Sequence, residues 1–402
     1  MSHYLFLGPR LVRAGEEIPE GYLLLEDGEI RAFGPLDALR TERLVSDSAR
    51  KVVDLRGSRL TVIPGMIDMH IHGAYGADVM DATPEALRVI AEGLAKDGTT
   101  GFLATTMTAP PRDIEAALKN VRDEHERAKS ATFGATLLGV HLEGPFLSPE
   151  RAGAQSKAYM LPPDSALILN WQHLSGGLIR QVTFAPERAA DDAFIKTLLN
   201  LGIVPSIGHS DAHHAEVVSA VRAGARQVTH LFNGMRPLHH RDPGVAGTAL
   251  IEDDLTVELI LDGVHWDLSL FKLVYRQKGI DKMLAITDAM RARGLGDGTY
   301  TLGGEIVHVE GKRATLGDGT LAGSVLSMQE AFQNAYRLGL PLSDVVRLTS
   351  TNAARQLGLS RKKGDIAVGY DADIVLLDGD YQVVATLVRG EVVYSAVGWL
   401  HG

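Results

Sequence analysis

The sequence predicts an α/β fold, a (β/α)8 TIM barrel, from two observations. Short apolar runs alternate with amphipathic helical patterns, and polar residues stand at the ends of several of these runs. Continuous apolar strands that alternate with helices are typical of a parallel sheet covered by helices. Eight such runs are the number that closes a barrel. They lie at about 67–72, 101–105, 136–142, 179–185, 203–208, 227–231, 256–262 and 283–287.

The segments between the runs carry signals for helix ends. The segment TPEALRVIAEGLAKDG follows the first run, with Thr83 placed to cap the helix and Gly98 to end it. The segment DAHHAEVVSAVRAGA follows the fifth run and has the same character, with His213 and His214 at the predicted helix start. We therefore assign residues 63–360 to the barrel.

Both ends of the chain have a β pattern. Residues 1–62 and 361–402 alternate apolar and polar residues and carry the hairpin turn signals Asp27-Gly28 and Asp378-Gly379. Because they flank the barrel, the two ends are predicted to pair into one small sheet domain.

Composition limits the classes of protein. The 402 residues include 45% hydrophobic and 22% charged residues, which is ordinary for a globular enzyme. No apolar run reaches the roughly 18 residues of a membrane span, and no secretion signal is recognised at the N-terminus. The absence of cysteine excludes disulfides and thiolate ligands and fits a cytoplasmic protein. The net charge of −10 argues against a nucleic-acid or anionic-membrane partner.

Six polar residues follow the barrel rule that catalytic groups lie at the carboxyl ends of strands. His70 and His72 alternate along the first run, so both side chains point to one face. The others end the third, fifth, sixth and eighth runs: Glu143, His209, His230 and Asp288.

This residue set suits metal-dependent hydrolysis. Four imidazoles and a carboxylate bind Zn²⁺, Fe²⁺, Mn²⁺ or Co²⁺, and one or two ions per chain are expected because Glu143 can bridge a pair. The metal would lower the pKa of bound water to about 7 and polarise a carbonyl oxygen. Asp288 would be the acid/base group. Each residue alone has a structural explanation: Asp288 could cap a helix, His209 could make a loop hydrogen bond, and Glu143 could form an ion pair. Their shared position at the ends of strands favours a metal site instead.

Three further segments are candidate substrate contacts. The loop 230–244 contains Arg236, His239, His240 and Arg241, which predicts an anion pocket beside the metal; the alternative is that some of them bind the protein's own carboxylates. The segment DGVHW directs His265 towards the same mouth. The backbone amides of the segment DGTLAGS are a third candidate contact. The alternative is that this segment is only a turn and a helix cap.

The motifs PGMIDMHIHG, FLATT, HLEGPFLSPERAGAQ, GHSDA, THLFNGM, HHRDPGVAGTAL, DGVH, ITDAM and DGTLAGS occur in this order between residues 64 and 324. In order and spacing they resemble the N-acetylglucosamine-6-phosphate deacetylases of the amidohydrolase superfamily. The resemblance implies a barrel with a small β-sandwich, usually as a homodimer. It also implies hydrolysis of N-acetyl-D-glucosamine 6-phosphate, an amino-sugar phosphate, to D-glucosamine 6-phosphate and acetate.

The resemblance also assigns residues. Glu143, His209 and His230 match the metal ligands of all members, His70 and His72 those of the two-metal members, and Asp288 the acid/base. The matching substrate-contacting residues are Ala154, Gln155, Asn233, Gly234, Arg241, Asp262, His265, Leu321, Ala322 and Gly323. Gly234 stands where Ala is common and Gln155 where some members have His.

Alternatives stay open at this point. The fourth run ends in TFAPE, without the lysine that bridges the metals of cyclic amidases of the superfamily. N-acetylgalactosamine 6-phosphate differs from the gluco sugar only in one hydroxyl's orientation. A non-catalytic metal-binding scaffold would have little need for Asp288. The metal's identity and the subunit served by Arg241 are not fixed by the sequence.

Overall fold

Eight parallel strands form the centre of the molecule. The computed structural model describes residues 3–37, 50–129 and 132–396. Its largest sheet has the order β17-β16-β15-β14-β13-β12-β11-β8, and parallel pairing of Ile71 with Ala289 connects the two ends of this order. The fold is therefore the expected (β/α)8 barrel. Its strands are β8 (Met66–Ile71), β11 (Thr99–Thr105), β12 (Thr136–Glu143), β13 (Ile179–Phe184), β14 (Val204–Ile207), β15 (Gln227–Val228), β16 (Thr256–Ile260) and β17 (Met283–Ile286).

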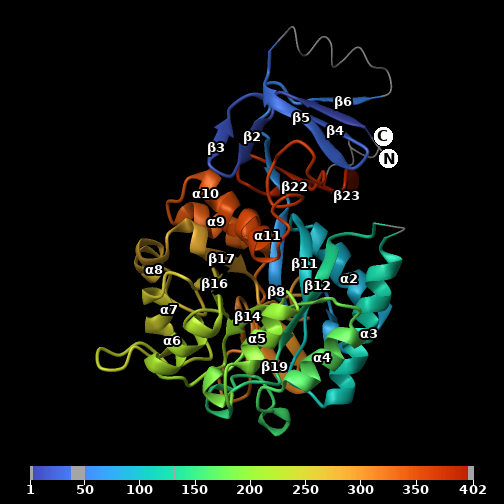
Figure 1. Cartoon of the computed structure of the whole chain (residues 1–402). Coiled ribbons are helices and arrows are strands. Elements are labelled where there is room, and N and C mark those ends of the chain that lie inside the picture. Colours follow the sequence, from blue (N-terminus) through green and yellow to red (C-terminus); the bar gives the residue numbers. More distant parts are fainter. Residues whose placement is uncertain (1–2, 38–49, 130–131, 397–402) are drawn as a thin grey trace.

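Each of the eight apolar runs contains one barrel strand, so this part of the prediction is confirmed. The strands are buried almost throughout, which explains why their sequences are continuously apolar and do not alternate. Helices cover the outside of the barrel (Figure 1). They are α2 (Pro84–Ala95), α3 (Pro111–Arg127), α4 (Ser165–Leu174), α5 (Ala193–Asn200), α6 (His214–Ala223), α7 (Gly244–Ile251), α8 (Phe271–Lys278), α9 (Met328–Arg337), α10 (Leu342–Val346) and α11 (Asn352–Gln356).

The predicted helix signals are confirmed for α2 and α6. The Thr83 side chain accepts a hydrogen bond from the backbone N–H of Ala86 and so caps α2. The chain turns at Gly98, whose φ is +77°, and an added Cβ would lie 2.7 Å from Cε of Met66. Glycine is therefore required where α2 returns to the barrel. Helix α6 begins at His214, with His213 as its cap.

Two further sheets are built from the ends of the chain, and both ends contribute to one of them. The four-stranded sheet β5-β4-β1-β6 comes from the N-terminal part, and the six-stranded sheet β23-β22-β21-β7-β2-β3 mixes both parts. This confirms the expectation of extra sheets built from both termini. The strands are β1 (Tyr4–Leu7), β2 (Arg10–Arg13), β3 (Glu16–Ile18), β4 (Gly21–Glu26), β5 (Glu29–Pro35), β6 (Lys51–Asp54), β7 (Thr61–Pro64), β21 (Ile374–Leu377), β22 (Val383–Val388) and β23 (Glu391–Ser395).

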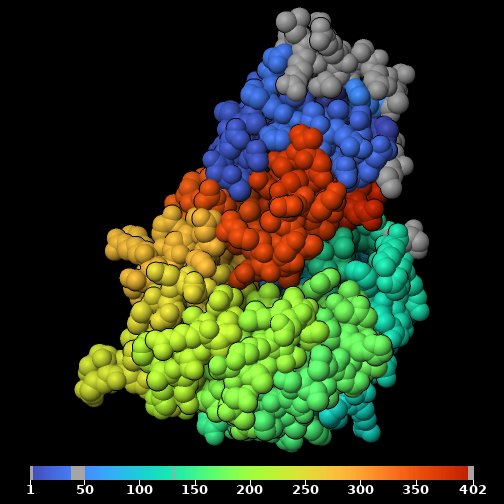
Figure 2. Space-filling view, in the orientation of Figure 1, coloured from blue at the N-terminus to red at the C-terminus, as the bar shows by residue number. Residues whose placement is uncertain are grey.

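The central strands of the six-stranded sheet are buried on both faces. Along β21, Ile374 and Leu376 join the core between the two terminal sheets, whereas Val375 and Leu377 join the barrel core. This division follows from the two-residue period of a strand. In Figure 2 the C-terminal segment (red) lies between the N-terminal segment (blue) and the barrel (green). The boundaries after residues 62 and 360 remain predictions.

Two small antiparallel sheets complete the fold. One is the pair β9 (Gly73–Ala74) and β10 (Ala77–Asp78), directly after the first barrel strand. The other joins β18 (Gly298–Leu302), β19 (Glu305–Glu310) and β20 (Arg313–Thr315). Figure 1 shows β19 at the end of the barrel away from the terminal sheets. Within the described residues, no helix has the length and apolarity to cross a membrane.

The packing of α4 gives a test of the fold. Trp171 on this helix is fully buried, and its ring lies 6.1 Å from that of Phe146. We expect Trp171→Ala to lower the free energy of unfolding by about 3–5 kcal/mol because it leaves a large cavity. The control is Leu169→Ala on the same helix, where the side chain is 52% exposed and a change within about 0.5 kcal/mol is expected. Equal effects of the two substitutions in denaturant titrations would contradict this packing.

Candidate metal centre

Four imidazoles surround the carboxylate of Glu143 at the carboxyl end of the barrel. The Nε2 atoms of His209 and His230 lie 3.3 and 3.2 Å from its Oε1 atom, and that of His70 lies 3.4 Å from the same atom. The Nε2 atom of His72 lies 3.1 Å from Oε2. Glu143 ends β12, so the barrel rule applied to the sequence brought these residues together correctly.

Asp288 faces the same group of imidazoles. Its Oδ1 atom lies 3.4 Å from Nε2 of His70 and 3.3 Å from Nε2 of His72. It also lies at the barrel's closure, because its N–H donates to the carbonyl of His70. The helix-cap alternative therefore does not describe Asp288. Two trios of potential ligands result, His70 with His72 and Asp288, and Glu143 with His209 and His230.

The geometry fits divalent metal ions. Two ligand atoms that are each about 2.1 Å from a tetrahedral ion are roughly 3.4 Å apart. The nitrogen–oxygen distances above are 3.1–3.4 Å. Moreover, Nε2 of His70 is buried and makes no hydrogen bond with any described residue. A buried lone pair without a donor is costly unless an ion occupies the position that it faces.

The charges of the site are mutually stabilised. Burial alone would raise the pKa of Glu143, but the facing imidazoles outweigh burial and hold that pKa well below its usual range. Burial lowers the pKa of His72, yet hydrogen bonding to Asp288 and Glu143 raises it to about 9. For Asp288, His70 and His72 outweigh burial and lower the pKa. Both carboxylates are therefore ionised at neutral pH, and a cation would replace protons on the imidazoles.

Neighbouring groups fix the orientation of these ligands. The Nδ1 atom of His209 lies 2.8 Å from the carbonyl oxygen of Arg151. The Gln155 side chain donates to Oε2 of Glu143 at 2.8 Å and accepts from the Thr108 N–H at 2.7 Å. Gln155 thus contacts a predicted ligand directly, in addition to any contact with substrate.

A cavity of about 710 Å³ opens over the site. His70 does not line it, but the other predicted ligands and Asp288 do. The lining also contains residues that were all predicted as substrate contacts: Ala154, Gln155, Asn233, Gly234, His265, Leu321 and Gly323. The cavity is also lined by Met107, Gly153, Leu302 and Thr320, which were not. Met107 follows the second barrel strand, so the strand-end rule was able to find it. Leu302 comes from β18, and no sequence signal places that sheet at the barrel mouth.

Two predicted contacts lie behind the cavity wall. Ala322 is fully buried in a small core with Leu302. The Asp262 carboxylate lies 2.7 Å from Nδ1 of His265 and accepts hydrogen bonds from the N–H groups of Val264 and His265. Asp262 therefore orients His265, which lines the cavity. The roles of both residues towards substrate remain predictions.

The basic loop divides into two parts. The guanidinium of Arg236 binds the carboxylates of Asp211 at 2.6 Å and Asp242 at 3.3 Å, so here the alternative of a partner within the protein holds. Arg241 is exposed, and its guanidinium contacts only the His240 ring nitrogen, at 2.8 Å, among the described residues. Figure 2 shows the yellow-green loop before α7 projecting from the body of the molecule. Arg241 does not line the cavity of its own chain.

Two buried polar residues at the site escaped the sequence analysis. His141 lies edge-on to His70 at 4.5 Å between ring centres, and its Nε2 atom lies 2.7 Å from Oγ1 of Thr183. Burial, together with the neighbouring imidazoles, lowers its pKa well below the usual range, so His141 is neutral. Glu258 is fully buried on β16. The signal for both was a polar residue inside an apolar strand.

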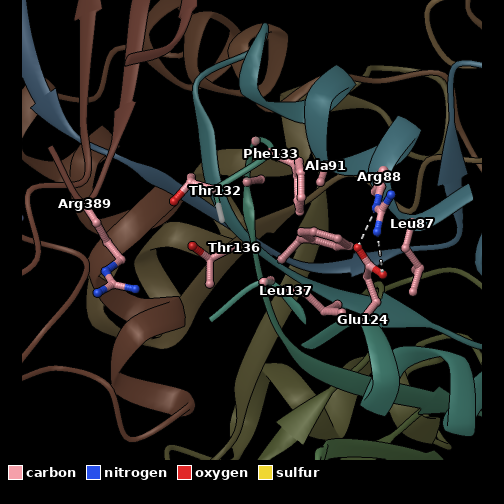
Figure 3. Close-up of a pocket in the computed structure, with 13 residues that line it drawn as sticks. Leu87, Arg88, Ala91, Glu124, Thr132, Phe133, Thr136, Leu137 and Arg389 are labelled. Carbon is pink, nitrogen blue, oxygen red and sulfur yellow. Dashed lines mark hydrogen bonds and ion pairs between the residues drawn. The ribbon is translucent and has the colours of Figure 1, made fainter. Parts of the chain in front are cut away.

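A second cavity, of about 540 Å³, lies between α2, α3 and the start of β12 (Figure 3). Its walls are mainly apolar, and the carboxylate of Glu124 in its lining is already paired with Arg88 at 2.8 Å. Among the described residues that line it there is no histidine. Within the described residues, the groups that could hold a metal ion are the two trios at the carboxyl end of the barrel.

The fold and this site together define the class of the metal-dependent barrel hydrolases. A family model described as "Amidohydrolase family" matches residues 61–393. The chain belongs to the amidohydrolase family, whose members depend on divalent metal ions.

Individual relatives are similar over almost the whole chain. N-acetylglucosamine-6-phosphate deacetylase of Bacillus subtilis (strain 168) is 44% identical over 385 residues, covering 96% of this chain and 95% of the relative. A solved Mycobacterium smegmatis N-acetyl-D-glucosamine-6-phosphate deacetylase variant, in complex with N-acetyl-D-glucosamine-6-phosphate, has a TM-score of 0.89 and 33% identity, covering 98% of this chain and 100% of that one. N-acetylgalactosamine-6-phosphate deacetylase of Escherichia coli O157:H7 is 33% identical, covering 97% and 99%.

Metal analysis tests the assignment of ligands. We expect His72→Ala to lower the number of tightly bound ions per chain by about one, because it removes one imidazole from one trio only. The measurement is elemental analysis after saturation and gel filtration. His308→Ala, which removes an exposed histidine of β19, is the control and should retain the wild-type content. Unchanged metal content in His72→Ala would remove His72 from the ligand set.

Proposed function

We propose that this protein hydrolyses the acetamide of N-acetyl-D-glucosamine 6-phosphate to D-glucosamine 6-phosphate and acetate, in the metabolism of amino sugars. The observation that carries the proposal is the meeting of four histidines, Glu143 and Asp288 at the carboxyl end of the barrel, in a chain that is 44% identical to a relative of this name. N-acetylgalactosamine 6-phosphate is less favoured as the substrate, because the relative named for it is 33% identical, compared with 44% for the relative named for the gluco sugar. The lack of cysteine supports the cytoplasm as the compartment.

We propose two ions per chain, with Zn²⁺ or Fe²⁺ preferred. Glu143 supports this number because its two oxygens face different histidines: Oε1 contacts His70, His209 and His230, and Oε2 contacts His72. A carboxylate in this position suits a bridge. When bound, the metal would polarise the amide carbonyl and lower the pKa of water, so that hydroxide is available as the nucleophile near neutral pH.

Asp288 is the proposed acid/base group. Both carboxylates line the cavity, but the Asp288 side chain is 12% exposed, compared with 3% for Glu143, so Asp288 is the more accessible to substrate. Its depressed pKa keeps it ionised and ready to accept the proton of the attacking water. The same carboxyl then delivers this proton to the leaving amine nitrogen. This second transfer is required because an unprotonated amine is a poor leaving group.

The cavity walls suggest how the sugar binds. The lining includes polar residues, among them His265 and Asn233, and apolar residues, among them Leu321, Leu302 and Met107. Because Asp262 holds Nδ1 of His265, the Nε2 atom of this ring is the one available to substrate. Gln155, Ala154 and Gly323 line the remaining surface. We propose that the hydroxyl and phosphate groups of the sugar contact the polar lining residues and that the acetyl methyl contacts apolar ones.

We propose further that the enzyme is a homodimer in which Arg241 binds the 6-phosphate in the partner's site. Three observations support this: Arg241 is exposed, it has no carboxylate partner among the described residues, and it lies outside the cavity of its own chain. A guanidinium suits a phosphate because it donates two parallel hydrogen bonds. In a C2 dimer each loop would serve the other subunit's site.

Acetate release from phosphorylated and unphosphorylated N-acetylhexosamines tests the reaction. The gluco 6-phosphate should be the best substrate. Asp288→Asn should retain the fold and metal but lose roughly 10²–10⁴-fold in kcat, because proton transfer is removed. Near-normal turnover in a metal-replete Asp288→Asn enzyme would contradict the acid/base role. A faster reaction with the galacto 6-phosphate would reverse the sugar assignment.

Arg241→Ala tests phosphate binding. We expect kcat/KM for the 6-phosphate to fall at least about tenfold, since a charge-assisted hydrogen bond is worth about 1.5–3 kcal/mol and 1.4 kcal/mol is a factor of ten. Hydrolysis of unphosphorylated N-acetylglucosamine should change little. Arg222→Ala on α6 removes the same charge from an exposed position and should affect neither substrate. Equal losses on both sugars would make Arg241 a structural residue.

Mixed dimers separate the two placements of Arg241. One subunit carries Asp288→Asn and the other Arg241→Ala. If Arg241 acts across the interface, one of the two sites regains both intact residues, and activity rises well above that of either parent homodimer. If Arg241 serves its own barrel, each site still lacks one group. No gain in dimers shown to be mixed would contradict the placement across the interface.

A further inference from the structure

A buried carboxylate inside the barrel has no place in the chemistry above. Glu258 lies in the middle of β16 and is fully buried. Among the described residues it contacts no lysine or arginine at ion-pair distance, and its recorded ion-pair partner is His70. A carboxylate is costly to bury, so its hydrogen bonds must account for its presence.

Glu258 accepts hydrogen bonds at both oxygens. The side-chain amides of Gln181 and Gln227 donate to Oε1 at 2.7 and 2.6 Å. At Oε2, Nδ1 of His70 lies at 3.1 Å and the backbone N–H of His230 at 3.3 Å. A carboxylate can accept hydrogen bonds at both of its oxygens. A glutamine at this position would instead direct its NH₂ group, a donor, towards one of the two pairs of donors.

The glutamine network points towards Glu258. Gln356 of α11 donates to Gln227, and Gln227 donates to Gln181 as well as to Glu258. Because each amide uses its oxygen to accept from the preceding one, its nitrogen is left to donate onwards. The chain of donors therefore ends at an acceptor, and this network holds Glu258 in one orientation.

The consequence for His70 is a fixed tautomer. With Nδ1 donating to Glu258, the proton of the neutral ring is on Nδ1, and Nε2 keeps its lone pair towards Asp288 and Glu143. The other predicted ligands differ. His209 is held by a backbone carbonyl, and Nδ1 of His72 and of His230 makes no hydrogen bond within the described residues. Among the described residues, His70 is thus the one ligand of the four whose Nδ1 atom contacts a carboxylate.

We propose that Glu258 is a positioning residue for one half of the metal centre, the trio of His70, His72 and Asp288. It orients the His70 ring, makes Nε2 a stronger ligand, and adds a buried negative charge beneath the second of two dications. The proposal rests on the two-ion site proposed above. It predicts that loss of Glu258 weakens one ion and spares the ion held by Glu143, His209 and His230.

The test is stepwise metal binding by purified protein, with Zn²⁺ or Co²⁺ as the probe. Glu258→Gln should raise the Kd of one ion about 10–100-fold and leave that of the other within a few-fold of wild type. Visible absorption of the Co²⁺ protein at one and two equivalents reports which ion is lost. Glu124→Gln is the control. It also neutralises a buried glutamate that accepts hydrogen bonds, from Arg88 and Arg127, so it should lower the melting temperature and leave both Kd values unchanged.

A double-mutant cycle distinguishes positioning from general structure. If Glu258 acts through His70, then adding Glu258→Gln to His70→Ala should change metal binding no further. Should Glu258→Gln fail to fold, Glu258→Asp is the second variant. It keeps the carboxylate but moves it away from His70, because its side chain is one methylene shorter, and it should weaken the binding of the same ion by a smaller factor. Unchanged Kd values, equal losses of both ions, or a full effect in the His70→Ala background would each overturn the proposal.

Metal binding and deacetylation can fail independently. A protein that shows the expected Kd pattern but releases no acetate from any N-acetylhexosamine would keep the role of Glu258 and remove the proposed reaction. A protein that binds one ion at saturation and still releases acetate would remove the role of Glu258 and keep the reaction.

Discussion

The site depends on one carboxylate that four imidazoles approach at once. Glu143 attracts four side chains that arrive from three other strands, and it lies at the end of β12 with little exposed surface. Burial makes this charge expensive and its interactions strong, so the ligands are arranged before any metal binds. The parallel barrel makes the arrangement possible, because its strands all end at the same mouth.

The backbone at the mouth is strained where the ligands leave the strands. His209, His230 and Asp288 have φ values of +46°, +30° and +51°, a region that residues with a Cβ rarely adopt. Each such residue costs on the order of 1–3 kcal/mol, which the buried barrel below must offset. The turn lets a residue just beyond the strand direct its side chain inward. This explains why three of the six site residues stand two positions after a strand's last residue.

Most of the fold and the ligand set could be predicted because both follow periodic rules. The apolar runs gave the eight strands, and the strand-end rule gave the six residues of the centre. Arg236 and Arg241 show where such rules stop. They stand in one loop with similar neighbours, yet only Arg236 meets Asp211, which comes from the preceding loop. Leu302 reaches the cavity through a sheet whose place depends on tertiary packing. Glu258 was visible as a charge in an apolar strand, but its partners were not.

The short connection between the terminal sheets and the barrel has a consequence for how the protein can be divided. Strand β7 pairs with β21 and is separated by Gly65 alone from β8, the strand that carries His70. An added Cβ at Gly65 would lie 2.0 Å from Oγ1 of Thr100, so this joint packs directly against β11 and has no space for a side chain. The sheet domain is therefore not a detachable module. It fixes the position of the first barrel strand, and a barrel cut free of it would lose the anchor of its own metal ligands.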